Sequence, residues 1–295
     1  MKSAAFLGLF ACLAISSAAP TAQQRAAGTK TAQIYVSVVD DKGAAVPGLS
    51  VRDFAVREDG SVREVLKVEP ATEPLDIMLV VDDSQAATAY IPYLRDGLTR
   101  FVDRMQGKAQ IGLVTMGERP TSVVEYTTDV AALKKGIGRV FARPGSGAYL
   151  LEAVRDVSRG LQRREGPRPT IVALTTEGVE FSNLQYERVI EEIRKSDATF
   201  HALAIGTPAA AVSDELRNRG RLLSEGTKET GGRQDQLLTP MAIPDRMAQL
   251  ADELLNQYLV TYGRPETLIP PEKVQVTTTK PGLTARARTR PTTKK

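Results

Sequence analysis

The sequence predicts an α/β fold in which a doubly wound, mostly parallel sheet is inserted into a small β-domain. Two observations predict it. Strand patterns alternate with amphipathic-helix patterns over residues 73–257, which is typical of a parallel sheet covered by helices on both faces. Alternating strand patterns without helices occupy residues 23–72 and 258–295. Neither terminal set buries two faces alone, so we expect both chain ends to form one β-domain.

Residues 1–22 have the pattern of a secretory signal peptide. Lys2 precedes an apolar stretch from Ala4 to Ile15, and small residues follow it. We expect cleavage after Ala18 or Ala22 rather than retention of this stretch as a membrane anchor. The mature protein is therefore predicted to be secreted or periplasmic.

The composition limits the chemistry available to the mature chain. Cys12 is the only cysteine and lies in the signal region, so neither a disulfide nor a thiolate metal site is expected. A lipoprotein modified at Cys12 is less favoured, because the apolar stretch continues beyond it. The net charge of +4 comes from 39 basic and 35 acidic residues, a mixed surface that gives little reason to expect a nucleic-acid partner.

The terminal segments show strand patterns separated by turn residues. N-terminal strands are predicted at Gln33–Val39, Ser50–Arg57 and Val62–Val68. The step Asp59-Gly60 favours a tight hairpin between the last two. C-terminal strands are predicted at Tyr258–Tyr262, Lys273–Thr279 and Leu283–Arg290.

The central segment supplies the parallel sheet and its helices. Strands are predicted at Leu75–Val81, Gln110–Met116, Ser122–Tyr126, Thr170–Leu174 and Thr199–Ile205. Helices are predicted at Thr88–Met105, Val130–Phe141, Tyr149–Leu161, Leu184–Lys195 and Ile243–Gln257. The unbroken apolar run Ile77–Val81 indicates a strand that is covered on both faces. No helix or strand is assigned within the variable segment 206–242.

The first central strand ends in Asp82, Asp83 and Ser84. Open α/β sheets bind ligands at the carboxyl ends of their strands, so these residues form a candidate site. Phosphoacceptor receiver domains also begin with such an acidic pair. They require a further Asp and a Lys at the ends of later strands, and the later predicted strands here offer neither.

The pattern Asp82-x-Ser84 resembles the Asp-x-Ser-x-Ser metal ion-dependent adhesion site of von Willebrand factor type A domains. Three later segments resemble further loops of that domain in the same order: Gly145–Ala153, Leu174–Gly178 and Glu229–Arg233. The flanks 38–70 and 257–288 resemble the bacterial VWFA-related family, in which an exported β-module carries a type A domain. This resemblance implies a type A domain mounted on a small immunoglobulin-like β-domain.

The resemblance also implies a Mg²⁺ site held by two Ser of the first loop and a Thr of the second, with Asp residues acting largely through water. Asp82 and Ser84 match that pattern. Ala86 replaces the second Ser, Ala148 replaces the Thr, and Glu177 replaces the Asp of the third loop. Mg²⁺ tolerates little departure from six oxygens. We therefore predict a degenerate metal site, with Asp82, Ser84 and Glu177 as its remaining candidate ligands, and no bound cofactor.

Two alternatives stay open at this position. In the first, neighbouring oxygens complete a wetter and weaker metal site; the candidates are Ser146, Thr175, Thr176 and Asp83. In the second, the residues are structural. Ser84 or Thr88 then caps the following helix, and Asp82 lies favourably near the positive end of its dipole.

Three other features have mainly structural interpretations. His201, the only histidine, lies in a predicted interior strand without a nucleophile beside it, so packing is favoured over catalysis. Gly231-Gly232 predicts a backbone turn that uses positive φ. The three arginines of residues 286–290 alternate on one strand face. This favours a solvated or edge-protecting face over a contact with a polyanion or membrane surface.

These features together predict an exported binding protein that recognises an unidentified protein or extracellular macromolecule. The contact is expected through the β-domain or through the top of the sheet, at Asp82, Asp83, Ser84, Ala86, Ala148 and Glu177. No enzymatic reaction is implied, and a membrane contact is expected only through the signal peptide or the basic tail. The alternatives are a metal-dependent hydrolase that uses the same carboxylates and an architectural envelope protein without a functional site.

Overall fold

A computed structural model describes residues 29–208, 210, 212–265 and 269–290. The predicted signal peptide, residues 1–22, lies outside these ranges. Within them, no helix combines the length and the apolar character needed to cross a membrane.

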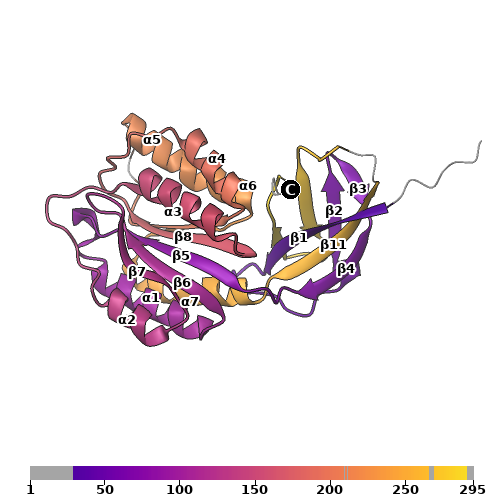
Figure 1. Ribbon diagram of the computed structural model, residues 1–295, viewed down its shortest axis with the longest axis horizontal. Helices are drawn as coiled ribbons and strands as arrows, with labels where there is room; N and C mark the ends of the chain where they lie inside the picture. The colour runs from indigo at the N-terminus through magenta and orange to yellow at the C-terminus, as the bar shows by residue number, and fades with distance from the viewer. Residues whose placement is uncertain (1–28, 209, 211, 266–268, 291–295) are drawn as a thin grey trace, which may run out of the picture.

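The centre of the fold is a six-stranded sheet in the order β10-β9-β8-β5-β6-β7 (Figure 1). Its strands are β5 (Leu75–Val81), β6 (Ala109–Thr115), β7 (Thr121–Thr127), β8 (Arg168–Thr176), β9 (Thr199–Ile205) and β10 (Gln234–Leu237). Only β7 at one edge runs antiparallel to its neighbour. This arrangement confirms the predicted α/β fold with a mostly parallel sheet.

Helices cover both faces of this sheet (Figure 1). One face carries α1 (Ile91–Met105), α2 (Val130–Ile137) and α7 (Ile243–Leu255). The other carries α3 (Leu150–Arg164), α4 (Tyr186–Ser196), α5 (Asp214–Arg221) and α6 (Thr227–Thr230). In β5, Ile77 and Leu79 pack into the first apolar cluster, whereas Met78 and Val80 pack into the second. All seven residues of this strand are buried, as its unbroken apolar run predicted.

The segment 206–242 contains elements that the sequence patterns did not predict. They are α5, a π-helical turn at Leu222–Gly226, α6, β10 and a 3-10 turn at Pro240–Ala242. The α5 sequence is almost wholly polar, so it shows no apolar stripe. The Ser213 hydroxyl accepts a hydrogen bond from the N–H of Leu216 and caps its start.

Two smaller antiparallel sheets, the terminal sheets, use strands from both chain ends. The first contains β1 (Thr29–Val39), β4 (Val65–Pro70), β11 (Tyr258–Pro265) and β13 (Thr284–Arg286) in the order β13-β1-β11-β4. The second contains β2 (Phe54–Glu58), β3 (Ser61–Arg63) and β12 (Val274–Thr278) in the order β12-β2-β3. Side chains from both sheets, including Val36, Val56 and Val260, share one apolar cluster.

The tight hairpin predicted at Asp59-Gly60 is confirmed. Glu58 pairs with Ser61 across a two-residue turn, and φ is 47° at Asp59 and 83° at Gly60. Positive φ at both central residues gives the turn a twist that matches the flanking strands. The strand predicted at Ser50–Arg57 is shorter than expected, because a 3-10 turn occupies Val51–Asp53.

Arg168, at the start of β8, joins the terminal sheets to the α/β part. Its side chain is buried, and its Nη1 donates to the carbonyl oxygens of Ala71 and Glu73. Its Nη2 donates to the carbonyl of Leu254 and to Oε1 of Gln257, at 2.9 and 2.6 Å. One guanidinium thus fixes the two chain segments that lead into and out of the central sheet.

A second buried connection surrounds Glu253 on α7. Its carboxylate lies 2.6 Å from Nη2 of Arg286 and 3.4 Å from Nη1 of Arg233. Burial opposes ionisation, but these guanidinium groups and His201 lower the pKa of Glu253. His201 itself is packed inside, where its Nδ1 accepts the N–H of Arg233 and burial lowers its pKa to about 4.

The arginines of residues 286–290 do not form the solvated strand face that their alternation suggested. Arg286 reaches the buried Glu253, Arg288 pairs with Asp197, and Arg290 lies 4.0 Å from Glu229. The expectation of a solvated face was wrong for Arg286 and Arg288, because a period of two identifies a shared face and not what covers it. Glu253 and Asp197 of the α/β part cover these two side chains, whereas Arg290 is exposed.

Candidate functional site

Asp82 follows β5 and connects the first and third loops above the sheet. Its Oδ1 accepts the N–H of Ser84 at 2.9 Å, and its Oδ2 accepts the N–H and the hydroxyl of Thr176 at 2.9 and 2.5 Å. The side chain is fully buried. Both carboxylate oxygens are therefore engaged by the protein itself.

The Asp83 carboxylate also makes contacts within the protein through both of its oxygens. Its Oδ1 accepts the N–H of Gly117 at 2.6 Å, and its Oδ2 lies 2.8 Å from Nε of Arg143. The hydrogen bond to Asp83 raises the pKa of Arg143. A Cβ added at Gly117 would lie 2.7 Å from Oδ1 of Asp83, so the close approach of these two loops requires glycine.

Ser84 is buried, and its Oγ has no hydrogen-bond partner among the described residues. Neither it nor Thr88 caps the following helix. A 3-10 turn at Gln85–Ala87 intervenes, the Thr88 hydroxyl donates to the carbonyl of Gln85, and α1 begins only at Ile91. The predicted capping roles were therefore wrong, and the Ser84 hydroxyl is left without a structural role.

Ala86 and Ala148 lie where the three loops meet. A Cβ added at Gly178 would come within 2.4 Å of the Ala86 methyl, so the first and third loops are in close contact there. Ala148 donates its N–H to the carbonyl of Val179, and its carbonyl accepts the N–H of Phe181, both at 2.8 Å. Ala148 thus holds the second loop against the third through its backbone.

Glu177 contacts residues outside the first two loops. Its Oε2 lies 3.2 Å from Nη1 of Arg219 on α5, and its Oε1 accepts a 3.4 Å hydrogen bond from Gln236 on β10. The structure therefore places Asp82, Ser84, Ala86 and Ala148 in touching loops but engages the Glu177 carboxylate in an ion pair.

Residues 77–178 match the family model of the von Willebrand factor type A domain. The chain contains a type A domain. A UPF0353 protein of Mycolicibacterium paratuberculosis is 30% identical over 115 residues, which are 35% of this chain and 34% of that protein. The chain thus spans about a third of the length of this curated relative. These matches confirm the resemblance to bacterial VWFA-related proteins.

Solved structures share the fold of this type A domain at low sequence identity. A von Willebrand factor type A protein from Catenulispora acidiphila has a TM-score of 0.53 at 13% identity, covering 90% of this chain and 73% of that one. Proximal thread matrix protein 1 from the mussel byssus, with a zinc-occupied MIDAS motif, has a TM-score of 0.50 at 14% identity. That match covers 67% of this chain and 49% of the mussel chain.

The donor atoms of this type A domain do not fit the metal that such domains are expected to hold. Ala86 and Ala148 offer methyl groups, both Asp82 oxygens accept hydrogen bonds, and Glu177 pairs with a guanidinium. Of the implied ligands, only the Ser84 hydroxyl is free among the described residues. Within these residues, no three acidic, His or Cys side chains group as metal ligands would.

The oxygens proposed to repair the site are mostly engaged as well. The Ser146 hydroxyl donates to the carbonyl of Arg143 at 2.8 Å, and the Thr176 hydroxyl donates to Asp82. Thr175 is the exception, because its buried Oγ1 has no hydrogen-bond partner in the described ranges. Two isolated hydroxyls are far from the six oxygens that Mg²⁺ requires.

Sequence reasoning missed Glu180, a buried acid in the third loop. Its Oε1 accepts the N–H groups of Leu150 and Ser182, each at 3.1 Å, and so satisfies a free donor at the start of α3. Burial raises its pKa to about 7, although the hydrogen bonds from Ser182 act in the opposite direction. No motif marks this residue, since its role depends on the fold of the loop.

Exposed apolar side chains on the third loop were also missed. Val179 is 60% exposed and Phe181 is 45% exposed. The Phe181 ring lies 5.9 Å from that of Tyr149, and a Cβ added at Gly147 would come within 2.5 Å of it. The only sequence signal of these exposed side chains was the presence of Val179 and Phe181 in a loop after Gly178.

Proposed function

We propose that this protein is an exported binding protein whose type A domain contacts a protein partner at the top of the sheet without a metal ion. The observation that carries the proposal is the exposure of Val179 and Phe181 beside Ala148, whose backbone hydrogen bonds hold their loop. Protein contact surfaces are enriched in aromatic side chains such as that of Phe181.

The carboxylates of the site support a contact that needs no ion. Asp82 and Asp83 are both used internally, so neither is free to reach a partner or to act as the base that the hydrolase alternative requires. Phe141 adds a further exposed ring two residues before Arg143, which pairs with Asp83. The guanidinium of Arg95 lies 4.1 Å from its centroid. The loops around the site thus present apolar and aromatic groups.

Export and domain organisation belong to the same proposal. The N-terminal pattern of residues 1–22 supports a secreted or periplasmic location. We infer that residues 23–72 and 258–295 form an immunoglobulin-like domain on which the type A domain of residues 73–257 is mounted. The antiparallel pairing of β1 with β11 and the shared apolar cluster support this division.

A retention experiment on envelope proteins of the producing cells tests the proposal. Immobilised mature protein is compared with Phe181→Asp, and with Val62→Asp as a control, because Val62 is 64% exposed on β3 in the terminal sheets. We expect the wild type and the control to retain the same partner with or without EDTA, and Phe181→Asp to lose it while its melting temperature is unchanged. Loss of the partner on chelation, or its retention by Phe181→Asp, would contradict the proposal.

A further inference from the structure

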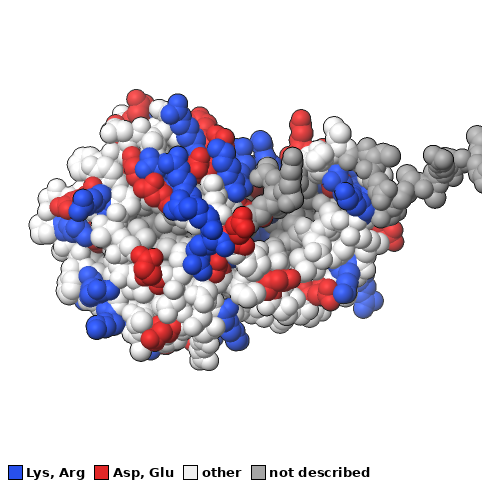
Figure 2. Space-filling view, in the orientation of Figure 1, with Lys and Arg blue, Asp and Glu red and all other residues white. Residues whose placement is uncertain are grey.

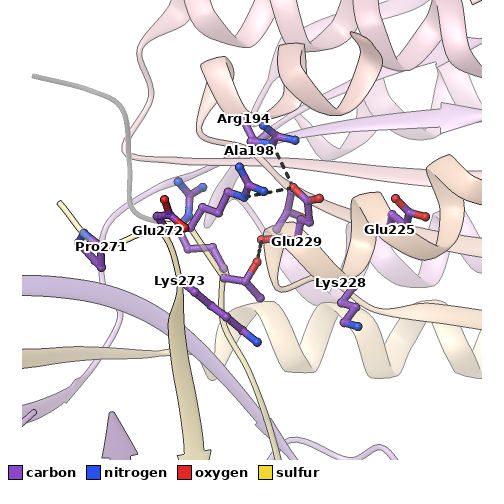
Figure 3. A pocket seen from close by; sticks show the side chains of 12 residues that line it. Arg194, Ala198, Glu225, Lys228, Glu229, Pro271, Glu272 and Lys273 are labelled. Atoms are coloured by element: carbon purple, nitrogen blue, oxygen red, sulfur yellow. Dashed lines mark hydrogen bonds and ion pairs between the residues drawn. The ribbon is translucent and has the colours of Figure 1, made fainter. Parts of the chain in front are cut away.

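A cavity of about 860 Å³ lies between the α/β part and the terminal sheets (Figure 3). Residues from α4 and α6 line one side, and the segments before β12 and after β13 line the other. Ala198 in its wall precedes β9, whereas Asp82 follows β5, and these strands run parallel to each other through β8. The cavity and the site above the sheet are therefore at opposite ends of the central strands.

The lining carries more positive than negative charge. Its five basic residues are Arg194, Lys228, Lys273, Arg288 and Arg290, and its three acidic residues are Glu225, Glu229 and Glu272. Figure 2 shows a band of Lys and Arg side chains, with acidic groups between them, over the neighbouring helices α3 and α4. The described lining residues carry a formal charge of +2.

Most of these charges are in ion pairs, and the exceptions among the described residues are the ammonium groups of Lys228 and Lys273 and the carboxylate of Glu272. Glu229 lies 3.0 Å from Arg194 and 4.0 Å from Arg290, so one carboxylate faces two guanidinium groups (Figure 3). Lys228 and Lys273 are exposed, and no carboxylate of the described residues lies within ion-pair distance of either. In Figure 3 both lie below Glu229 and point away from its carboxylate.

The wall of the cavity is held in place. The N–H of Thr289 donates to the carbonyl of Glu229 at 2.9 Å, and the N–H of Val274 donates to the carbonyl of Thr289 at 2.7 Å. Gly231, with φ of 76°, lets the backbone of Ala287 approach the end of α6, since an added Cβ would lie 2.3 Å from its carbonyl carbon. These hydrogen bonds fix the backbone next to Lys228 and next to Lys273.

The π-helical turn Leu222–Gly226 leads directly into this cavity. Glu225 of the turn and Lys228 one residue into α6 both line it. π-helical turns are rare within helices and are found frequently at functional sites. This feature is independent of the charges and points to the same place.

We propose that the cavity binds an acidic peptide segment through the ammonium groups of Lys228 and Lys273. Its volume is that of an ordinary ligand site. The described residues of the lining include no aromatic side chain on which a nucleobase could stack, which argues against nucleic acid. The guanidinium of Arg194, whose planar fork suits phosphate, is already paired with a carboxylate. This inference goes beyond the proposed function and does not depend on it.

Fluorescence anisotropy with a labelled peptide of six glutamates tests the proposal on the full mature chain. The comparison ligand is the same peptide with six glutamines. The cavity variant is Lys228→Gln/Lys273→Gln. The control is Lys108→Gln/Lys135→Gln, which removes equal charge from exposed lysines near α1 and α2 on the other face of the sheet.

We expect the wild type and the control to bind the glutamate peptide and not the glutamine peptide. The cavity variant should bind the glutamate peptide about tenfold more weakly, which is the size expected for two surface ammonium–carboxylate contacts. Equal binding of both peptides, or an equal loss in the control, would overturn the proposal. Competition by inorganic phosphate as effective as unlabelled peptide would also overturn it, because the cavity would then be a small-oxyanion site.

Discussion

Oδ2 of Asp82 accepts two hydrogen bonds from Thr176, one from its backbone N–H at 2.9 Å and one from its hydroxyl at 2.5 Å. The first acidic residue of the adhesion-site pattern therefore clamps the end of β5 to the end of β8. A hydrogen bond to a charged group contributes about 1.5–3 kcal/mol. The carboxylate of Asp82 thus has a structural role that needs no metal.

The clamp predicts a large effect of substitution at Asp82 and almost none at Ser84. Asp82→Ala should lower the free energy of unfolding by about 3 kcal/mol, because it leaves the buried donors of Ser84 and Thr176 without an acceptor. Ser84→Ala should change it by less than about 0.5 kcal/mol, since the Ser84 hydroxyl makes no hydrogen bond to the described residues. Urea titration measures both. A large loss in Ser84→Ala would reveal a bound water or ion at this hydroxyl.

The junction between the α/β part and the terminal sheets should be sensitive to one arginine. Arg286→Ala leaves the buried Glu253 with only the longer contact to Arg233, and removing one partner of a buried pair costs about 3 kcal/mol or more. The control Arg100→Ala breaks exposed pairs and should cost less than about 1 kcal/mol. Equal effects in thermal unfolding would mean that the Glu253 contact does not hold the junction.

The raised pKa of Glu180 predicts a pH-dependent effect of Glu180→Gln. The unfolded chain releases this proton near pH 4.5, whereas the folded chain keeps it until about pH 7. The wild type therefore loses stability from this group as pH rises through that window. Glutamine does not titrate, so the variant should gain up to roughly 3 kcal/mol relative to the wild type between pH 4.5 and 7. A difference that is constant with pH would contradict this assignment.

Processing at the N-terminus gives a prediction that needs no structure. The exported protein should begin after Ala18 or Ala22, because the apolar stretch before them matches the hydrophobic region of a signal peptide. Intact-mass spectrometry of the exported protein measures the cleavage point. Detection of a lipid-modified Cys12 would show that the chain is a lipoprotein instead.

The sequence located those parts of the fold whose pattern is local. The bounds predicted for β5 and β9 match the structure, since a strand buried on both faces is an apolar run with polar ends. Helix α5 could not be found in this way. Its sequence DELRNRGR lacks an apolar stripe, and it is held by distant contacts such as that between Arg219 and Glu177.

The sequence predicted the position of the candidate site, but not the hydrogen bonds and ion pairs within it. The order of the loops predicted that they meet above the sheet, and in the structure Ala86 lies against Gly178 and Ala148 bridges to Glu180 in the third loop. Nothing in the motif indicated that Thr176 would donate a hydrogen bond to Asp82 or that Arg143 would form an ion pair with Asp83. These partners lie 94 and 60 residues away in the chain, and only the fold brings them into contact.

Calorimetric titration of the mature protein with Mg²⁺ tests most directly whether this type A domain works without a metal. The wild type should give no binding heat at millimolar Mg²⁺, because Ala86 and Ala148 supply no lone pair and Glu177 is held by Arg219. The variant Ala86→Ser/Ala148→Thr/Glu177→Asp should bind Mg²⁺ and gain thermal stability when it is added. Saturable binding of Mg²⁺ by the wild type would contradict the metal-free site.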